Sequence, residues 1–160
     1  MNKYAYFSGG CFWGMEHLFR KLEGVLEVTC GYMGGTTVQP SYQEVCSHNT
    51  GHYETVEVCY DDHVINYPSV AQYFFEIHDP TQKDGQGPDI GEQYQSVLWY
   101  QTEEELATAQ ELIRRLEQKG LDIATKTRPV ATFYKAEEYH QKHYLKRGSE
   151  PYCHIHTKRF

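Results

Sequence analysis

The chain has 160 residues, enough to bury a hydrophobic core, and its formal net charge is −7. The acidic balance argues against nucleic acid as the main partner, and no stretch is long and apolar enough to cross a membrane. No Pro/Gly/Ser-rich linker divides the sequence, so a single domain over residues 1–160 is predicted. The first residues lack the layout of a secretory signal, so a cytoplasmic location is expected.

The first third of the chain predicts a strand, a helix and a second strand. Residues 3–8 alternate and contain aromatic side chains, as a strand does, and a glycine pair follows them. Apolar residues then recur at helical spacing over residues 15–22, up to a glycine, and residues 26–32 alternate again. This order predicts a βαβ unit with parallel strands and a right-handed crossover.

The rest of the chain adds further strands and helices. A loop rich in glycine and threonine carries one short helical turn after Pro40, and Thr102 with Glu105 forms the capping box of a later helix. The remaining predicted elements are a strand over 52–61, a helix over 69–79, a strand over 93–100, a helix over 102–120, a strand over 128–134, a weak helix over 135–145, and an irregular tail. The prediction is an α/β (α+β) fold with a mixed β-sheet covered by helices.

The sequence contains five cysteines, an odd number that cannot all pair within one chain: Cys11, Cys30, Cys46, Cys59 and Cys153. None belongs to a C-x-x-C motif, so neither a thioredoxin-type redox pair nor a zinc ribbon is indicated. In a reducing compartment most such cysteines are small buried residues, and a minority do chemistry.

Cys11 lies between a predicted strand and a predicted helix, in the stretch SGGCFWG. The start of a helix favours an anion and should lower the pKa of a thiol, and the glycines permit a sharp turn that leaves the sulfur approachable. Phe12 and Trp13 would then form the wall of an apolar pocket. The alternative is that Cys11 fills a tight turn as a small residue, with Phe12 and Trp13 in the core.

Glu54 is the second candidate functional residue. In the strand HYETVEV, alternation places Glu54 on the same face as Val56 and Val58, whereas Glu57 points to the other side. A carboxyl among apolar groups is pushed towards its protonated form and can act as an acid. The alternative is that Glu54 lies at the wet end of the strand or pairs with a lysine.

Several blocks of the sequence resemble, in the same order, those of the A-type peptide methionine sulfoxide reductases, which reduce the S epimer of methionine sulfoxide. The blocks are GGCFWG at 9–14, GYMGG at 31–35, PSYQEVCSHNTGHYETVEV at 40–58, FFEIHDPTQKDGQGPDIGEQYQS at 74–96 and AEEYHQKHYL at 136–145. The resemblance covers most of the chain. It implies a two-layer fold around a mixed sheet and a role in protein repair under oxidative stress.

The resemblance also implies roles for individual residues. They are Cys11 as the nucleophile, Phe12 and Trp13 as the pocket for the methyl group of the sulfoxide, Glu54 as the acid, Tyr32 and Tyr94 as donors to the sulfoxide oxygen, and Asp89 as an organiser of the pocket. The chemistry fits these residues, because a sulfoxide oxygen leaves only when donors converge on it while a thiolate attacks the sulfur.

The reaction leaves Cys11 as a sulfenic acid, which a second thiol can convert to a disulfide. In the family, a cysteine near the C-terminus commonly does this and thioredoxin reduces the product, which implies Cys153 as the resolving residue. The sequence departs from the family at Pro151-Tyr152-Cys153, where Gly-Tyr-Cys is common. Cys30 and Cys59 are expected to be structural, and Cys46 to have no such role. No bound cofactor or metal is expected, the substrate is free or protein-bound, and a monomer is expected.

Parts of the sequence also fit three other functions. The first is a metal module, for which the C-terminal region offers His140, His143, Cys153, His154 and His156 in spacings that match no standard finger. The second is a cysteine-dependent phosphatase, which needs an arginine close after the cysteine, whereas the first here is Arg20. The third is a non-catalytic peptide-binding domain, which should tolerate alkylation of Cys11.

Overall fold

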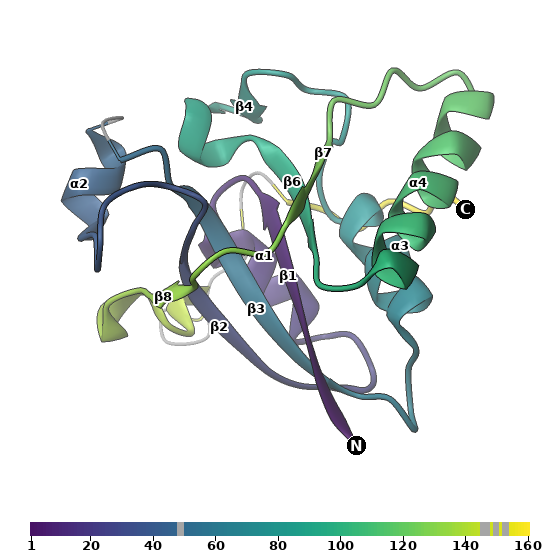
Figure 1. Ribbon diagram of the computed structural model, residues 1–160, viewed down its shortest axis with the longest axis horizontal. Helices are drawn as coiled ribbons and strands as arrows, with labels where there is room; N and C mark the ends of the chain where they lie inside the picture. The colour runs from purple at the N-terminus through teal and green to yellow at the C-terminus, as the bar shows by residue number, and fades with distance from the viewer. Residues whose placement is uncertain (48–49, 145–147, 149–150, 152–153) are drawn as a thin grey trace.

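The computed structural model describes residues 1–47, 50–144, 148, 151 and 154–160. In this part of the chain a six-stranded mixed sheet has the order β7-β6-β1-β3-β2-β8, and β4 and β5 form a separate pair (Figure 1). The strands are β1 (Asn2–Gly9), β2 (Val25–Met33), β3 (Tyr53–Asp61), β4 (Gly85–Gln86), β5 (Asp89–Ile90), β6 (Ser96–Tyr100), β7 (Lys126–Pro129) and β8 (Tyr134–Lys135). The helices are α1 (Phe12–Phe19), α2 (Tyr42–Cys46), α3 (Tyr67–Glu76) and α4 (Glu103–Gln118), with the 3-10 turns η1 (Glu92–Tyr94) and η2 (Glu138–His140). The predicted α/β fold with a mixed sheet is confirmed.

The βαβ unit at the N-terminus is split by a third strand. β1 and β2 are each antiparallel to β3, so they run parallel to one another, as predicted, but β3 lies between them. Because β3 pairs along both edges, it is buried along most of its length. This position in the middle of the sheet takes Glu54 out of solvent.

One face of the sheet carries the main hydrophobic core, beneath α1, α3 and α4. Phe7 of β1 stacks between Phe19 of α1, with ring centroids 5.3 Å apart, and Phe74 of α3, at 4.8 Å. All three rings are fully buried. The core therefore ties the strand that precedes Cys11 to two helices and fixes where that strand ends.

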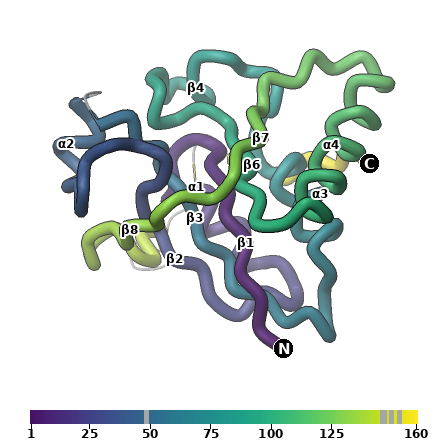
Figure 2. The backbone as a smooth tube through the Cα atoms, viewed as in Figure 1, coloured from purple at the N-terminus to yellow at the C-terminus, as the bar shows by residue number. Residues whose placement is uncertain are grey.

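The other face is covered by the segment that links β7 to β8. The sequence predicted one strand over 128–134, but the structure has two, at opposite edges of the sheet: β7 pairs with β6 and β8 pairs with β2. The link crosses in front of the sheet (Figures 1 and 2), and its Phe133 packs on Tyr6, with ring centroids 5.6 Å apart. Pro129, which has no N–H to donate, ends the first of the two strands.

The capping residues near Pro40 and at Thr102 correctly predict where α2 and α4 begin. Ser41 and Glu44 form a capping box for α2, which is the short turn predicted after Pro40. The hydroxyl of Thr102 caps α4 by accepting from the Glu105 N–H, but the Glu105 carboxylate accepts from Gln101, so only half of the predicted box forms. None of the helices in the described part of the chain has the length and apolar character that a membrane span requires.

The first part of the weak helix predicted over 135–145 is replaced by the end of β8 and the turn η2, and among its described residues only 143–144 are α-helical. The side chain of Gln141 accepts from the Cys30 N–H at 2.8 Å and donates to the Cys30 carbonyl at 3.0 Å. These bonds hold the segment against β2, and tertiary contacts thus outweigh a marginal helical pattern. The consequence is that residues 137–140 reach the region of α1.

Candidate active site

Cys11 lies where β1 gives way to α1. It is the N-cap residue of α1 and its carbonyl accepts the Met15 N–H at 3.4 Å, so the predicted position at a helix N-terminus is confirmed. Gly10 precedes it with φ of +94°, a left-handed conformation that favours glycine. Cys11 is 7% exposed. A sharp turn thus delivers a nearly buried thiol to the positive end of a helix.

Glu54 of β3 lies directly against this helix start. The backbone N–H of Phe12 donates to Glu54 Oε1 at 3.1 Å, and the residue is 1% exposed. Its other oxygen, Oε2, is buried with no hydrogen-bond partner among the described residues. The structure therefore brings the two candidates, Cys11 and Glu54, together, and excludes the alternative that Glu54 lies at a wet strand end.

Burial keeps the Glu54 carboxyl protonated. Loss of solvation raises the pKa of Glu54 to about 8, the bond from the Phe12 N–H opposes the shift, and the nearby charge of Asp89 adds to it. At neutral pH the side chain is therefore a neutral acid with a proton to give.

Two candidate tyrosines approach the same region from different elements. Tyr32 of β2 is the cross-strand partner of Glu54, and its hydroxyl donates to Glu137 Oε1 at 3.0 Å. Tyr94 comes from η1 and is partly buried. Burial raises the pKa of both hydroxyls, and the charges of Glu137 at Tyr32 and Glu54 at Tyr94 raise them further. Both are neutral hydrogen-bond donors over the physiological range.

Phe12 and Trp13 form an aromatic wall on the first turn of α1. Phe12 is buried and lies 5.7 Å from the ring of Tyr32. Trp13 is partly buried, its Nε1 donates to His140 Nδ1 at 3.0 Å, and its ring stacks on that of His143 at 3.7 Å. The wall thus has an apolar surface in a fixed orientation.

Asp89 approaches the site from the small β4–β5 pair, where it lies opposite Gln86. Its charge raises the pKa values of Glu54 and Tyr94. Cys153, the last of the candidates, lies outside the described residues.

Sequence reasoning missed several residues that complete the site. The Glu137 carboxylate accepts from Tyr32 and from the Tyr42 N–H, the latter at 3.0 Å; burial works against its ionisation, but these bonds lower its pKa. Burial raises the pKa of the Cys46 thiol, and the hydroxyls of Tyr42 and Tyr94 oppose this shift. No spacing rule points to these residues. Only their presence in the blocks at 40–58 and 136–145 could have drawn attention to them.

Cys30 behaves as the structural thiol that the sequence suggested. It is fully buried and donates to the Phe12 carbonyl at 3.5 Å. Burial raises the pKa of this thiol well above its usual value, so it stays protonated. It supports the backbone beside Cys11 without competing as a nucleophile.

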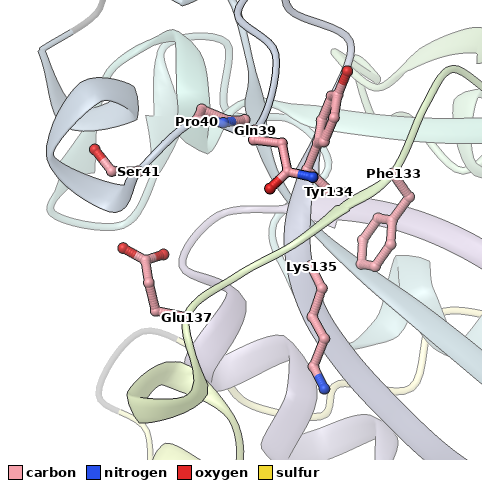
Figure 3. Close-up of a pocket in the computed structure, with 7 residues that line it drawn as sticks. All are labelled: Gln39, Pro40, Ser41, Phe133, Tyr134, Lys135 and Glu137. Carbon is pink, nitrogen blue, oxygen red and sulfur yellow. The ribbon is translucent and has the colours of Figure 1, made fainter.

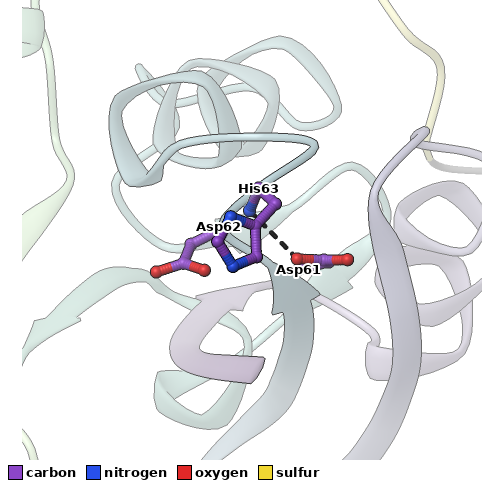
Figure 4. A group of neighbouring side chains, drawn as sticks. All are labelled: Asp61, Asp62 and His63. Carbon is purple, nitrogen blue, oxygen red and sulfur yellow. Dashed lines mark hydrogen bonds between the residues drawn. The ribbon is translucent and has the colours of Figure 1, made fainter. Parts of the chain in front are cut away.

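The C-terminal histidines do not gather into a metal site in the described residues. His140 bonds Trp13, His154 bonds the Gly9 carbonyl, and His156 bonds Glu76. The group of potential ligands found in the described chain is instead Asp61, Asp62 and His63, at the end of β3 (Figure 4). Those aspartates face the N-terminal ammonium, 3.0 Å from Asp62, which accounts for their clustering.

Arg20 does not serve Cys11 as a phosphatase arginine would. Its guanidinium is bound to Glu16, to Glu27 and to the Val28 carbonyl.

A cavity of about 430 Å³ opens beside Glu137, between the loop before α2 and β8 (Figure 3). It is lined by Gln39, Pro40, Ser41, Phe133, Tyr134, Lys135 and Glu137.

The raised pKa of Glu54 predicts a pH-dependent cost in stability. Between its ordinary value of 4.5 and about 8, the folded chain holds a proton that the unfolded chain has released, so stability falls as pH rises through this window. Relative to Glu54→Gln, the free energy of unfolding of the wild type should fall by roughly 1 kcal/mol per pH unit. Urea unfolding at several pH values checks this. Parallel stability curves for the two proteins would contradict it, and Glu57→Gln, on the opposite face of β3, is the control that should retain the slope.

Comparison with known proteins identifies the family. Residues 3–160 match the family model described as peptide methionine sulfoxide reductase. The peptide methionine sulfoxide reductase MsrA of Nautilia profundicola is 44% identical over 149 residues, 93% of this chain and 86% of that one. Reduced Mxr1 from Saccharomyces cerevisiae superposes with a TM-score of 0.91 at 34% identity, over 98% of this chain and 92% of that one. A structure of Mxr1 in complex with Trx2 has the same fold, with a TM-score of 0.66 at 24% identity over 98% and 90% of the two chains. The chain therefore belongs to the peptide methionine sulfoxide reductase family and is an oxidoreductase that acts on methionine sulfoxide.

Proposed function

We propose that this chain reduces the S epimer of methionine sulfoxide, free and in proteins, with Cys11 as nucleophile and Glu54 as proton donor. The observation that carries the assignment is the unpartnered Oε2 of Glu54, buried beside the turn that holds Cys11. A buried polar atom without a partner is costly, and a ligand oxygen at that position would satisfy it.

In the first step the sulfur of Cys11 attacks the sulfoxide sulfur while Glu54 gives its proton to the sulfoxide oxygen. The S–S bond formed by this attack then breaks as the hydroxyl moves from the substrate sulfur to the Cys11 sulfur. The substrate sulfur thereby gains two electrons and becomes the sulfide of methionine, and Cys11 loses two electrons and becomes a sulfenic acid. The Glu54 proton is available because burial places the pKa of this carboxyl at about 8. The N-terminus of α1 stabilises the attacking thiolate.

Two tyrosines assist at the oxygen. Tyr94 offers a neutral hydroxyl from η1, and Tyr32 offers one from the strand position opposite Glu54. A tyrosine hydroxyl carries a single proton, so Tyr32 must exchange Glu137 for the substrate oxygen when it donates. Donors without formal charge suit a half-apolar pocket, because they polarise the oxygen without a buried ion.

Phe12 and Trp13 hold the methyl group of the sulfoxide, and Asp89 helps to organise the pocket. An enzyme can distinguish the two epimers at the sulfur if it binds the oxygen on one side of the pocket and the methyl group on the other. Here the oxygen partners, Glu54 and the tyrosines, come from the sheet and η1, whereas the aromatic wall comes from α1. This separation supports a preference for one epimer.

In the second step the thiol of Cys153 condenses with the Cys11 sulfenic acid, which forms a disulfide and releases water. Thioredoxin, or another dithiol, then reduces the disulfide, so no bound cofactor is needed. Trx2 bound to Mxr1 supports a thioredoxin partner. We place the enzyme in the cytoplasm, because recycling by a dithiol needs a reducing compartment. A monomer suffices, since one chain supplies the site.

An assay on the two separated sulfoxide epimers tests the assignment. The wild type should release methionine from the S epimer and little from the R epimer, and Cys11→Ser should release none, because an alcohol replaces the nucleophile. Turnover by Cys11→Ser equal to that of the wild type would refute Cys11 as nucleophile. Cys30→Ser, a buried thiol near the same helix, is the matched control.

Glu54→Gln removes the acid while keeping an oxygen for the Phe12 N–H. We expect the rate at neutral pH to fall by about 100-fold or more, as for loss of a general acid. In the wild type, activity should also fall as pH rises through about 8, where Glu54 loses its proton, and the variant should lack this limb. Glu57→Gln, which faces away and accepts from Tyr6, should change neither property. Full activity of Glu54→Gln at neutral pH would rule out the acid role.

Cys153→Ser should still release one methionine per enzyme but recycle poorly with thioredoxin, because the sulfenic acid has lost its resolving thiol. Single-turnover yields and thioredoxin-driven steady-state rates measure the two steps separately. Cys59→Ser, a buried thiol of β3, should recycle normally. If Cys153→Ser recycled as fast as the wild type, the resolving role would belong to another thiol or to direct reduction.

A further inference from the structure

Gly9 ends β1, where it pairs with Ser96 of β6, and Gly10 carries the chain out of the sheet with φ of +94°. Gly9 and Gly10 have no side chains, so the peptide that joins them can rotate at little steric cost. The orientation of that peptide sets the direction in which Cys11 leaves β1. Gln86 constrains one side, because a Cβ added at Gly10 would lie 2.4 Å from the Gln86 Cβ.

His154 constrains the other side of the turn. Its Nε2 lies 2.7 Å from the Gly9 carbonyl oxygen, and the residue is 2% exposed. The imidazole ring packs against Gly14 so closely that an added Cβ there would lie 2.2 Å from Nδ1. The ring therefore occupies the space that a glycine on the first turn of α1 leaves open.

The protonation state of this histidine follows from its partner. A carbonyl oxygen only accepts, so Nε2 carries a proton and donates it to Gly9. Burial lowers the pKa of His154, although the bond to Gly9 opposes the shift, so the ring is neutral at physiological pH. A neutral ring locks the Gly9–Gly10 peptide without placing a charge beside Cys11.

The segment after His154 is itself bound to α3, which limits the movement of His154 away from Gly9. Glu76 of α3 accepts from His156 Nε2 at 3.0 Å, from the Thr157 N–H through its carbonyl at 2.7 Å, and from the Arg159 N–H at 3.1 Å. Arg159 also donates to the Phe75 carbonyl. His154 is thus tied to the main core through α3 and to the catalytic turn through Gly9.

We propose that His154 is a positioning residue for Cys11, whose Nε2–H bond to the Gly9 carbonyl fixes the Gly9–Gly10 peptide and so aims the thiol at the substrate held by Glu54. The inference rests on the proposed role of Cys11 as nucleophile. Its bond to the Gly9 carbonyl acts through the backbone of the turn, so the role assigned to His154 is to position Cys11.

The test compares His154→Phe, which keeps a ring but has no donor, with His154→Gln, whose amide N–H can replace Nε2–H. Both are made in the Cys153→Ser background and assayed for a single turnover without reductant. His154→Phe should lose about tenfold or more in the rate of methionine release, since small misplacements of reacting groups cost this much. His154→Gln should retain most of the rate. His63→Phe, an exposed histidine at the far end of β3, should match the parent.

A second readout separates positioning from a general loss of structure. The pH profile for alkylation of Cys11, followed on its own peptide by mass spectrometry, should change in His154→Phe and not in His63→Phe. Gly14→Ala provides an independent variant, because its Cβ displaces the ring while alanine favours the helix. Gly14→Ala should slow the single turnover although His154 is intact. If His154→Phe does not fold, this variant tests the positioning role of His154.

Folded His154→Phe or Gly14→Ala with the parent's single-turnover rate and alkylation profile would overturn the proposal. That result is distinct from failure of the proposed function, which would appear as an inactive parent protein or an active Cys11→Ser.

Discussion

The hydrogen bond from the Phe12 N–H to Glu54 Oε1 joins the first turn of α1 to the central strand of the sheet, and the rest of the site is arranged around it. It uses one of the unpaired N–H groups at the helix start, which must find a partner when buried. It also fixes one carboxyl oxygen next to the start of α1, while Oε2 is buried with no hydrogen-bond partner among the described residues. In the proposed mechanism, the Phe12 N–H and the buried acid Glu54 together define where the sulfoxide oxygen binds.

Of the two acidic groups proposed to react, the Cys11 thiol and the Glu54 carboxyl, only the thiol needs to become an anion before the reaction. A thiolate at Cys11 and a carboxylate at Glu54 would repel each other at close range. Burial in β3 and the charge of Asp89 keep Glu54 protonated, so the helix start can favour the thiolate alone. The negative charge of Glu137 lies further out, bound to Tyr32 and the Tyr42 N–H. Attack on sulfur and protonation of oxygen can therefore proceed near neutral pH.

Sequence patterns located the parts of the site that depend on local periodicity. The strand–glycine–helix order placed Cys11 at the start of α1, and alternation in β3 put Glu54 on the buried face. Patterns missed what depends on contacts between distant segments. Packing between distant parts of the chain, which no short stretch of sequence contains, fixes three features. They are the insertion of β3 between β1 and β2, the division of residues 128–134 between two sheet edges, and the contacts of Glu137 and His154. The resemblance identified the blocks that hold some of these residues, but only the fold shows what each one touches.

Competition for protons orders the donors at the substrate oxygen. The hydroxyl of Tyr32 is already engaged by Glu137, whose hydrogen bonds keep it ionised and therefore a strong acceptor. A sulfoxide oxygen must compete with that carboxylate for the hydroxyl proton of Tyr32. Glu54 Oε2, in contrast, has no hydrogen bond to a protein acceptor to break among the described residues. In the proposed mechanism, Glu54 is therefore the donor that meets the oxygen first. Tyr32 would join as negative charge builds on the oxygen during attack, so its contribution would belong to the transition state more than to substrate binding.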